Sequence, residues 1–581
     1  MSFSNSNVAK MLRGVAAAYT LKKATIFQIR AYENAADAIE HSTSEVKDLW
    51  DDNQLDQLSG IGPGLRGYLD ELFKTGKVKH WEETKKGIPE AVFEFLDIPG
   101  VGPKTALELS KFGVKSIKDL EDKLKSGELI RKGFSEKVAI RIGSALRRQV
   151  VGIKDGRMLL PYAFVQAEKV LEYLKKSPDV VQADALGSLR RMVATVGDLD
   201  FAVATKNPEG IVRHIVSMPG VAQVVDKGDT KATVRLGSGV QLDFLLTHPD
   251  GYGALLQHFT GSKQHNIHLR TIAQKKGFSV SEYGVKKVKG EEIIKCEMEE
   301  ELYEMLGMET PVPEIRENTG EIEAALEHKL PKLIELKDIK GDLHIHSSFP
   351  IEPSHDLGLD SPEDMIAEAK KMGYSYLGLS EHQPSVANHT PEQMVELIKR
   401  KAKLVEHINS SDRNTRVINL LEIDIMPDGS ISVPDEALKL LDFAIAGVHS
   451  VHRMDKDKMT VRILKALANP YVKVLTHPTG RLLNERESFE ADWPRIFEFA
   501  AKNNKALEIN SFPNRLDLSD SLVREAKRYG VKFVINTDSH EASQMENMRF
   551  GVAVARRGWA TKEDSVNAWD FKKFAKWFGI V

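Results

Sequence analysis

The amino-acid sequence predicts a multidomain protein in which all-α units come first, an α+β unit follows, and an α/β barrel forms the C-terminal part. Three observations lead to this prediction. Apolar residues recur at helical spacing through residues 1–150, around two short glycine-containing turns. Strand-like runs join the helices from about residue 158. After residue 338, strands and helices alternate, which is typical of a parallel sheet or barrel.

Changes in these patterns divide the chain of 581 residues into several units, as its length also requires. The first two units are predicted to be helical, the third α+β, and the fourth helical with a small mixed region at its end. A linker then leads to the barrel. The predicted bounds are 1–80, 81–150, 151–250, 251–315, 316–338 and 339–581.

The composition, 41% hydrophobic and 28% charged, is that of a soluble globular protein. No apolar run approaches the roughly 20 residues that a membrane-spanning helix needs. The net charge of −3 does not indicate nucleic-acid binding by itself, although a basic part can be balanced by an acidic one. The single cysteine, Cys296, excludes an internal disulfide and is compatible with a reducing compartment. These features are compatible with a cytoplasmic protein.

The two glycine-containing turns, SGIGPGL at 59–65 and IPGVGPKTA at 98–106, each precede an amphipathic helix pattern. Glycine lets another chain approach closely, and the exposed N–H groups of such a turn can bind a phosphate oxygen without reading bases. One such turn alone would favour a simple connection between helices, but two favour binding to the DNA backbone. The predicted DNA-binding residues are Gly60, Gly62, Gly100, Gly102 and Lys104.

Three carboxylates lie in the strand-like runs of the α+β unit. Asp198 and Asp200, in VGDLDF, face the same side of a strand because strand side chains alternate. Asp243, in VQLDFLLT, lies in an apolar run where a carboxylate needs a partner or a metal. Two such acids alone are weak evidence, since exposed strand ends often carry them. With Asp243, the set suits a pair of divalent ions that serve phosphoryl transfer.

Residues 1–315 resemble the family X DNA polymerases, through the helical N-terminus, the two hairpin turns, GS…RR…GDLD in the palm and FTGSKQHNIHLR in the thumb. The resemblance implies a nucleotidyltransferase palm at 151–250 and a thumb at 251–315. It also implies that Asp198, Asp200 and Asp243 bind Mg²⁺, which activates the primer 3′-hydroxyl and holds the incoming triphosphate. The implied nucleotide contacts are Gly187, Ser188, Arg191, Phe259, Gly261, Asn266 and Arg270.

The sequence departs from the family pattern at several positions. Met192 and Ala194 stand where a small residue and a glutamate are usual, and His258 replaces a tyrosine. None of these changes removes a metal ligand, so we expect polymerisation to persist with altered efficiency or sugar selection. Tyr68 stands at the position of the lysine that forms a Schiff base in members with deoxyribose-phosphate lyase activity, so we expect little lyase activity.

Ligand-type residues recur at the ends of apolar strands in the C-terminal part, where ten of the 18 histidines lie. One such histidine is more often a packing or surface residue, but a whole set of this kind is not. The carboxyl ends of barrel strands meet at one mouth, so the set predicts a polynuclear metal site. The predicted ligands are His344, His346, His382, Glu422, His449, His477, Asp538 and His540.

Residues 339–581 resemble the PHP (polymerase and histidinol phosphatase) domain, a distorted (β/α)7-type barrel that binds up to three metals. The order HxH, H, E, H, H, DxH carries the resemblance. The usual ninth ligand, an acid or histidine shortly after HxH, is replaced by Ile351; Glu352 and His355 are alternatives if the loop is longer, and Asp356 is near. The ligand types leave the metal open, with Mn²⁺ or Zn²⁺ expected.

These resemblances imply a repair polymerase that fills short gaps, with a metal-dependent 3′→5′ exonuclease in the barrel. Cleavage at abasic sites or of 3′-phosphoesters is an alternative activity of the barrel. The expected partners are gapped or primer–template DNA and dNTPs, with no membrane and a monomeric chain. Two other functions compete: a phosphoesterase whose polymerase half only positions DNA, and a noncatalytic scaffold that binds DNA ends.

Overall fold

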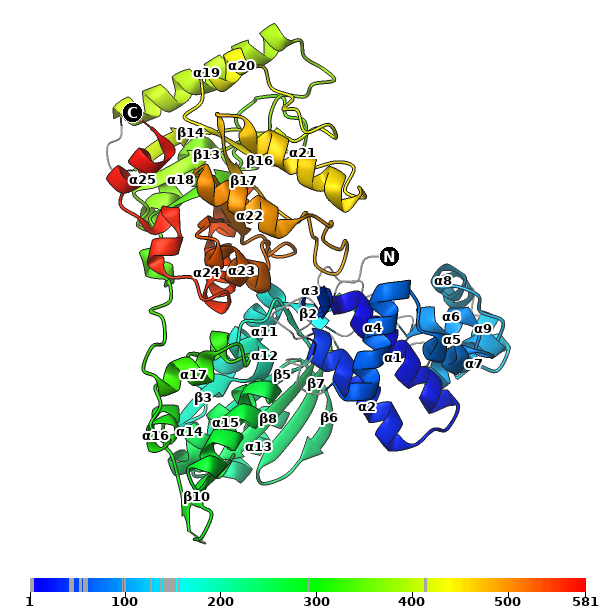
Figure 1. Ribbon diagram of the computed structural model, residues 1–581. Coiled ribbons are helices and arrows are strands. Elements are labelled where there is room, and N and C mark those ends of the chain that lie inside the picture. Colours follow the sequence, from blue (N-terminus) through cyan, green and yellow to red (C-terminus); the bar gives the residue numbers. More distant parts are fainter. Residues whose placement is uncertain are drawn as a thin grey trace. The chain divides into compact units, whose positions relative to one another are not determined.

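The computed structural model shows two compact units, which are treated separately below (Figure 1). Unit 1 comprises Met1–Leu159 and Thr195–Asp198, and unit 2 comprises Leu160–Ala194 and Leu199–Val581. None of the described helices is long and apolar enough to cross a membrane. The described residues are 5–40, 46–51, 55, 61–96, 98, 101–125, 128–135, 138, 142, 153–154, 157–237, 239–290, 292–411 and 415–580.

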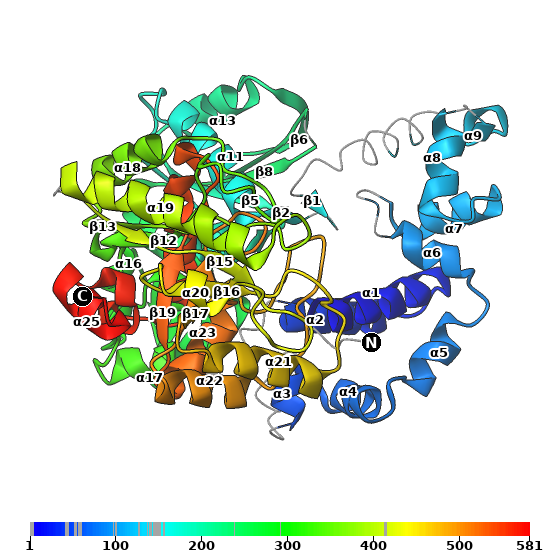
Figure 2. The same cartoon turned by 90° about the horizontal axis from the view of Figure 1, so that it is seen from above.

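Unit 1 is mainly helical, as the apolar periodicity predicts. Its helices are α1 (Asn5–Leu21), α2 (Ile26–Glu40), α3 (Val46–Asp51), α4 (Pro63–Thr75), α5 (Lys79–Lys85), α6 (Glu90–Phe95), α7 (Pro103–Lys111), α8 (Ile117–Lys125) and α9 (Glu128–Arg131). A small sheet contains β1 (Ile153–Lys154), β2 (Arg157–Leu159) and β4 (Thr195–Val196). Leu12, Ala36 and Trp81 belong to one buried core, and Phe95 and Leu109 to a second. Figure 2 shows α1 and α2 running side by side.

The first part of unit 2 is a five-stranded sheet with flanking helices. The strand order is β3 (Gln182–Ala185), β5 (Leu199–Ala204), β8 (Gln241–Thr247), β7 (Lys231–Leu236) and β6 (Val221–Lys227). Only β5 and β8 pair in parallel. The accompanying helices are α11 (Leu160–Leu174), α12 (Gly187–Arg190), α13 (Pro208–Val216), α14 (Tyr252–Thr260) and α15 (Lys263–Lys275).

A small antiparallel sheet and short helices follow. The sheet contains β9 (Phe278–Ser281), β10 (Gly284–Lys287) and β11 (Ile293–Ile294), and the helices are α16 (Glu299–Met305) and α17 (Glu321–Leu326). The segment expected to be a linker therefore contains a helix. Ile322 and Ala325 of α17 are fully buried in a core with Leu269 of α15 and Leu302 of α16. This packing fastens the segment to the thumb.

The C-terminal part is a barrel of parallel strands, so the prediction of an α/β barrel after all-α and α+β parts is confirmed. One sheet contains β12 (Gly341–Ile345), β13 (Tyr376–Leu379) and β14 (Arg416–Asn419). The other contains β15 (Glu422–Asp424), β16 (Ala444–Gly447), β17 (Val472–Leu475), β18 (Ala506–Asn510) and β19 (Lys532–Asn536). Parallel bridges from His382 to Glu422 and from Ile345 to Ser539 join the two sheets at both junctions and close the barrel.

Helices surround the barrel and cover one of its ends. They are α18 (Pro362–Lys371), α19 (Pro391–Ser411), α20 (Asp435–Leu438), α21 (Lys456–Ala468), α22 (Trp493–Lys502), α23 (Asp520–Arg528), α24 (Met548–Arg557) and α25 (Phe571–Phe578). Phe574 and Phe578 of α25 pack against Tyr376 and Phe443, which stand at or just before the amino ends of β13 and β16. The amino end of the barrel is thereby filled with aromatic side chains, and the carboxyl end is left for chemistry.

Candidate active sites

The palm sheet places two of its carboxylates side by side. Asp200 on β5 and Asp243 on β8 are register partners of parallel strands. Thr233 and Gln241 donate hydrogen bonds to Asp243 at 2.6 and 2.8 Å, and Lys231 Nζ lies 3.1 Å from it. Burial alone would raise the pKa of Asp243, but these three neighbours outweigh it and hold that pKa below its ordinary value. Asp243 is therefore a charged, oriented carboxylate.

A tight turn approaches Asp200 from the side of α12. The Leu186 N–H donates to the Asp200 carbonyl at 2.8 Å, and Gly187 follows with φ +59°. A Cβ added to Gly187 would lie 3.1 Å from Asp200 Oδ2. The turn therefore needs glycine twice, for its left-handed backbone and for its close approach to the carboxylate. Asp198 directly precedes β5 and is exposed.

The segment between α14 and α15 brings the predicted sugar and base contacts together. Gly261 ends α14 with φ +70°. Asn266 and Arg270, one turn apart on α15, both reach His258: Asn266 Nδ2 donates to its carbonyl at 2.7 Å, and Arg270 Nη2 lies 3.3 Å from its Nδ1. The ring of Phe259 lies 4.8 Å from that of His258. His258, which replaces the family's tyrosine, is thus the shared partner of this cluster.

The turn after α12 is fastened to this segment by arginines. Arg191 is 7% exposed, and its Nη1 donates to the Thr260 carbonyl at 2.6 Å. Its Nε lies 3.0 Å from Glu317 Oε1. Nη2 makes no further hydrogen bond within the described part of the chain. Ser188 is half-buried in α12. A phosphate oxygen would therefore find one free edge of the Arg191 guanidinium.

The described residues of the hairpin turns stand at helix starts in unit 1. Gly62 precedes α4 and Gly102 precedes α7, and no atom of the described residues lies within 4 Å of a Cβ added to either. Lys104, in the first turn of α7, is exposed. Each helix start therefore leaves room beside its glycine for a phosphate group. Gly60 and Gly100 lie outside the described residues.

The predicted barrel ligands converge at the carboxyl ends of the strands. His344 is in β12, Glu422 begins β15, and the other six lie just beyond the ends of β12, β13, β16, β17 and β19. Groups of three ligand atoms within 4.8 Å of one another form here among the described residues. The groups are His346, His382 and His540; His344, His346 and Asp538; His355, Asp424 and His449; and His382, Glu422 and His449.

Glu422 lies at the centre of this cluster and is 1% exposed. Its Oε2 lies 3.1 Å from His344 Nε2 and 3.0 Å from His382 Nδ1. Its Oε1 lies 3.1 Å from His449 Nε2 and 2.8 Å from His477 Nε2. Burial would raise the pKa of Glu422, but these rings hold that pKa well below its ordinary value. The two oxygens of this carboxylate therefore lie beside different imidazoles.

The cluster fits metal ions. Several buried ring nitrogens make no hydrogen bond in the described part of the chain, which is costly unless a cation uses them. Burial lowers the pKa of His477 to about 4, so that ring is neutral, as a metal ligand must be. His477 and Asp538 also have φ values of +29° and +56°, a strained backbone of the kind that functional sites hold in place. The nitrogens that make no hydrogen bond belong to His344, His346, His382, His477 and His540, and several of them lie beside carboxylate oxygens.

The structure adds residues that the sequence analysis did not single out. Glu508, fully buried in β18, lies 2.7 Å from His344 Nδ1 and accepts a hydrogen bond from the His477 N–H at 2.6 Å. Asp424 lies 2.7 Å from His449 Nδ1. Such outer carboxylates orient metal-binding imidazoles. Glu508 lies in the apolar run ALEIN, where a carboxylate needs a partner or a metal. The signal that indicated Asp243 would therefore also have indicated Glu508.

The loop after HxH folds back over the mouth of the barrel. Gly358 packs so closely on His346 that an added Cβ would lie 2.2 Å from the His346 carbonyl oxygen. Just before this contact, His355 Nε2 lies 3.2 Å from Asp424 Oδ1, and Asp356 Oδ2 lies 3.4 Å from His540 Nε2. The loop is thereby held with His355 and Asp356 facing the ligand set.

Ile351 and Glu352, which come earlier in this loop, take other roles. Ile351 is fully buried, and Glu352 pairs with His389 at 2.9 Å. Glu381, directly before His382, forms an ion pair with the buried Lys401 at 2.7 Å. These two carboxylates are therefore engaged outside the ligand set.

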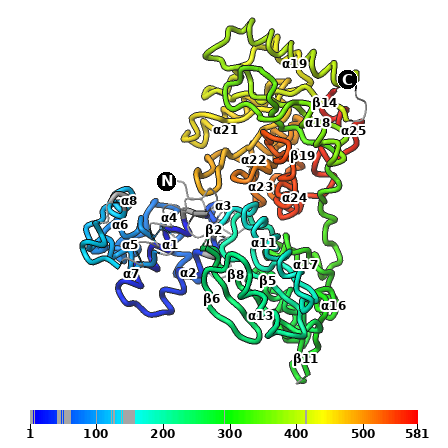
Figure 3. Tube along the Cα trace, turned by 180° about the vertical axis from the view of Figure 1, so that it is seen from behind, coloured from blue at the N-terminus to red at the C-terminus, as the bar shows by residue number. Residues whose placement is uncertain are grey.

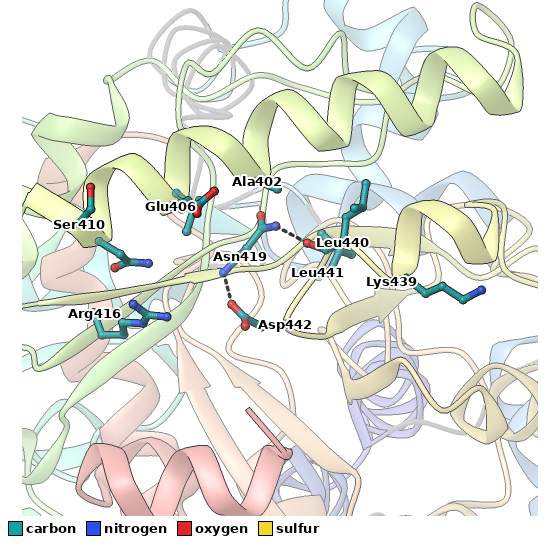
Figure 4. A pocket seen from close by; sticks show the side chains of 11 residues that line it. Ala402, Glu406, Ser410, Arg416, Asn419, Lys439, Leu440, Leu441 and Asp442 are labelled. Carbon is teal, nitrogen blue, oxygen red and sulfur yellow. Dashed lines mark hydrogen bonds between the residues drawn. The ribbon is translucent and has the colours of Figure 1, made fainter. Parts of the chain in front are cut away.

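A separate pocket lies between α19 and the segment that follows α20 (Figure 4). Asn419 donates to the Leu440 carbonyl at 2.8 Å inside it, and Asp442 accepts from the Asn419 N–H at 2.7 Å. Its rim mixes cations, such as Arg416 and Lys439, with carboxylates. None of the predicted ligands lines this pocket, so it is distinct from the metal cluster.

Parts of the chain match known family models. Residues 255–317 match the DNA polymerase beta thumb. Residues 3–78 match a helix-hairpin-helix domain, and residues 92–148 match a SAM-like helix-hairpin-helix tandem. The matches cover the thumb and both hairpin regions of the sequence analysis.

Whole-chain comparison gives similar proteins for each half. The chain is 34% identical over 575 residues to the DNA polymerase/3′-5′ exonuclease PolX of Bacillus subtilis, covering 97% of this chain and 98% of that protein. It is 26% identical over 316 residues to DNA polymerase lambda of Arabidopsis thaliana, covering 48% of this chain and 55% of that protein. A probable phosphatase of Acetivibrio thermocellus is 25% identical over 213 residues, covering 34% of this chain and 78% of that protein.

Proposed function

Because the chain belongs to the family X DNA polymerases of the PolX type, which carry a C-terminal PHP domain, we propose that its palm extends DNA primers and its barrel shortens them from the 3′ end. The protein is an enzyme, a DNA polymerase with a 3′-5′ exonuclease domain. The observation that carries the division of labour is the presence of two separate sets of possible metal ligands, carboxylates on the palm sheet and mainly histidines at the barrel mouth.

We propose the palm aspartates as the polymerase site. Asp200 and Asp243, paired in register, and Asp198 before β5 would hold Mg²⁺. When bound, these ions would lower the pKa of the primer 3′-hydroxyl and offset triphosphate charge. Thr233 and Gln241 keep Asp243 oriented and ionised. The nucleotide would be held by Gly187, Ser188, Arg191, Phe259, Gly261, Asn266 and Arg270.

We propose the barrel cluster as the nuclease site. Its eight predicted ligands, with Glu422 shared between imidazole pairs, suit Mn²⁺ or Zn²⁺. When bound, such ions would activate water and stabilise the departing 3′-oxygen of the DNA. Glu508 and Asp424 hold the rings of His344 and His449 in position. Arg515 Nε, 3.3 Å from Asp538 Oδ2, places a cation beside the cluster for the phosphate.

The polymerase family and the helix-hairpin-helix domains also indicate the substrates. DNA and dNTPs are the substrates of a polymerase with helix-hairpin-helix domains. We propose gapped or primer–template DNA, held by its backbone at Gly62, Gly102 and Lys104, because both glycines have room beside them among the described residues. We also propose that the enzyme acts as a monomer in the cytoplasm, where chromosomal DNA of a bacterial-type cell lies.

A single primer assay tests this function. A 5′-labelled primer on a gapped template is incubated with the protein and Mg²⁺ or Mn²⁺. We expect extension with dNTPs, shortening without them, and neither reaction after EDTA removes the metals. Extension without shortening would refute the exonuclease proposal for the barrel. Absence of extension with either metal would refute the polymerase proposal and favour a phosphoesterase that uses its polymerase half to position DNA.

We further propose that Asp356 supplies the ninth metal ligand, which Ile351 cannot provide. Asp356→Ala is expected to weaken binding of one barrel metal by about 10–100-fold, because its carboxylate lies near His540 and His382. Elemental analysis after dialysis against buffered Mn²⁺ or Zn²⁺ measures this directly. Glu352→Ala is the matched control, since Glu352 pairs with His389. Equal metal content in both variants would exclude Asp356 as a ligand.

A further inference from the structure

One arginine of the barrel reaches into the polymerase part. Arg557, the last residue of α24, is 6% exposed, and its Nε lies 2.7 Å from Asp520 Oδ2 at the start of α23. Its Nη1 lies 2.9 Å from Glu317 Oε1 and donates to the Arg191 carbonyl at 2.7 Å. Figures 1 and 3 both show α24 beside α11, next to α12. A single guanidinium thus joins the barrel, the end of the thumb and the turn after α12.

Glu317 is the centre of this link. Its side chain is 4% exposed, and Oε1 is shared between Arg191 Nε at 3.0 Å and Arg557 Nη1 at 2.9 Å. Burial would raise the pKa of Glu317, but the two guanidiniums outweigh it and lower that pKa. Loss of Arg557 would leave Glu317 with Arg191 alone, Asp520 without this cation and the Arg191 carbonyl without this donor. Arg557 thus holds the backbone of Arg191 directly and shares Glu317 with its side chain.

Arg191 in turn contacts the segment between α14 and α15, where the nucleotide is proposed to bind. Its Nη1 donates to the Thr260 carbonyl at 2.6 Å and would lie 3.3 Å from a Cβ added to Gly261. Arg190 Nη1 donates to Thr260 Oγ1 at 2.6 Å. Thr260 and Gly261 thus rest on the turn that Arg557 holds.

A strained residue lies at the same point. Met192, directly after Arg191, has φ +55°, a left-handed conformation that is strained for a residue with a side chain and that persists only where its surroundings hold it. The hydrogen bond from Arg557 to the Arg191 carbonyl holds the peptide group between Arg191 and Met192. The barrel thus stabilises the backbone that carries the phosphate-facing arginine.

We propose that Arg557 of the barrel is a positioning residue for the nucleotide pocket of the polymerase site, acting through Glu317 and Arg191. The proposal rests on the proposed function, which places Arg191 and Gly261 at the incoming nucleotide. It predicts that the barrel sets nucleotide affinity in the palm even when no nuclease reaction takes place.

The test compares two adjacent arginines. Arg557→Gln is expected to raise the KM for dNTP in single-nucleotide gap filling by about tenfold, the worth of one charge-assisted contact, with a smaller change in kcat. The exonuclease rate of the same preparation should stay at the wild-type level, and Arg557→Lys should recover part of the loss. Arg556→Gln is the matched control. Arg556 also extends away from the barrel, but it forms an ion pair with Glu314 at 2.7 Å and donates to the Ile334 carbonyl.

The outcomes separate the possibilities. A KM for Arg557→Gln no higher than that of Arg556→Gln, or an equal loss of exonuclease activity, would overturn the proposal. If Arg557→Gln does not fold, Glu317→Gln breaks the charge link while keeping the side-chain shape, and a wild-type KM in that variant would overturn it as well. A wild-type protein that inserts no nucleotide would instead refute the polymerase assignment on which the proposal rests.

Discussion

Replacing Asp243 with asparagine is expected to lower kcat for nucleotide insertion by about 10³-fold or more, with the 3′-5′ exonuclease rate unchanged. Asparagine keeps the shape of the side chain, so it can still accept the hydrogen bond from Thr233. It removes the negative charge that a divalent ion requires. Single-turnover insertion on a gapped, labelled primer measures the loss.

Asp226→Asn is the control for this variant, because Asp226 is an exposed carboxylate on β6 of the same sheet. It should insert nucleotides at the wild-type rate. The thermal midpoint of Asp243→Asn should stay close to that of the wild type. A variant that folds and still inserts nucleotides within tenfold of the wild-type rate would remove Asp243 from the metal site.

Glu422→Gln is expected to lower the exonuclease rate by about 10³-fold or more and to reduce the metal content of the barrel. Five histidine rings have a nitrogen within 3.4 Å of this carboxylate: His344, His346, His382, His449 and His477. No other carboxylate of the described residues holds that many imidazoles. A neutral amide loses both the charge and one acceptor oxygen, so the cluster would hold metal ions less well.

Shortening of a single-stranded 3′ end in Mn²⁺ and elemental analysis of the dialysed protein measure the two effects. Glu436→Gln, an exposed residue of α20, is the control. Nucleotide insertion by Glu422→Gln should remain at the wild-type level. Wild-type shortening by a metal-depleted Glu422→Gln protein would place the nuclease elsewhere in the chain.

The order of the parts was predictable because each depends on local pattern. Helical periodicity and glycine turns indicated the N-terminal helices, and alternating strands and helices indicated the barrel. The parallel pairing of Asp200 with Asp243 could not be predicted from local sequence pattern. It requires β8 to lie beside β5, although about 40 residues and two other strands separate them in the chain.

The loop after HxH shows a similar division. The spacing alone identified Ile351 at the usual ligand position and left Glu352, His355 and Asp356 as alternatives. The structure separates these, because Gly358 can approach His346 closely and so turns the loop back at His355 and Asp356. Glu352 pairs with His389 instead. The turn at Gly358, rather than residue type alone, decides which of these side chains face the ligand set.

The sequence by itself determined the chemical content of the protein: three aspartates in strand-like runs, eight ligand-type residues at strand ends, and glycine turns before helices. These are local signals, carried by residue type and short-range spacing. The tertiary structure decided which distant groups share a charge. Arg557, Glu317 and Arg191 lie far apart in the chain, yet burial brings them within hydrogen-bonding distance, because a buried charge is stable only beside its partners.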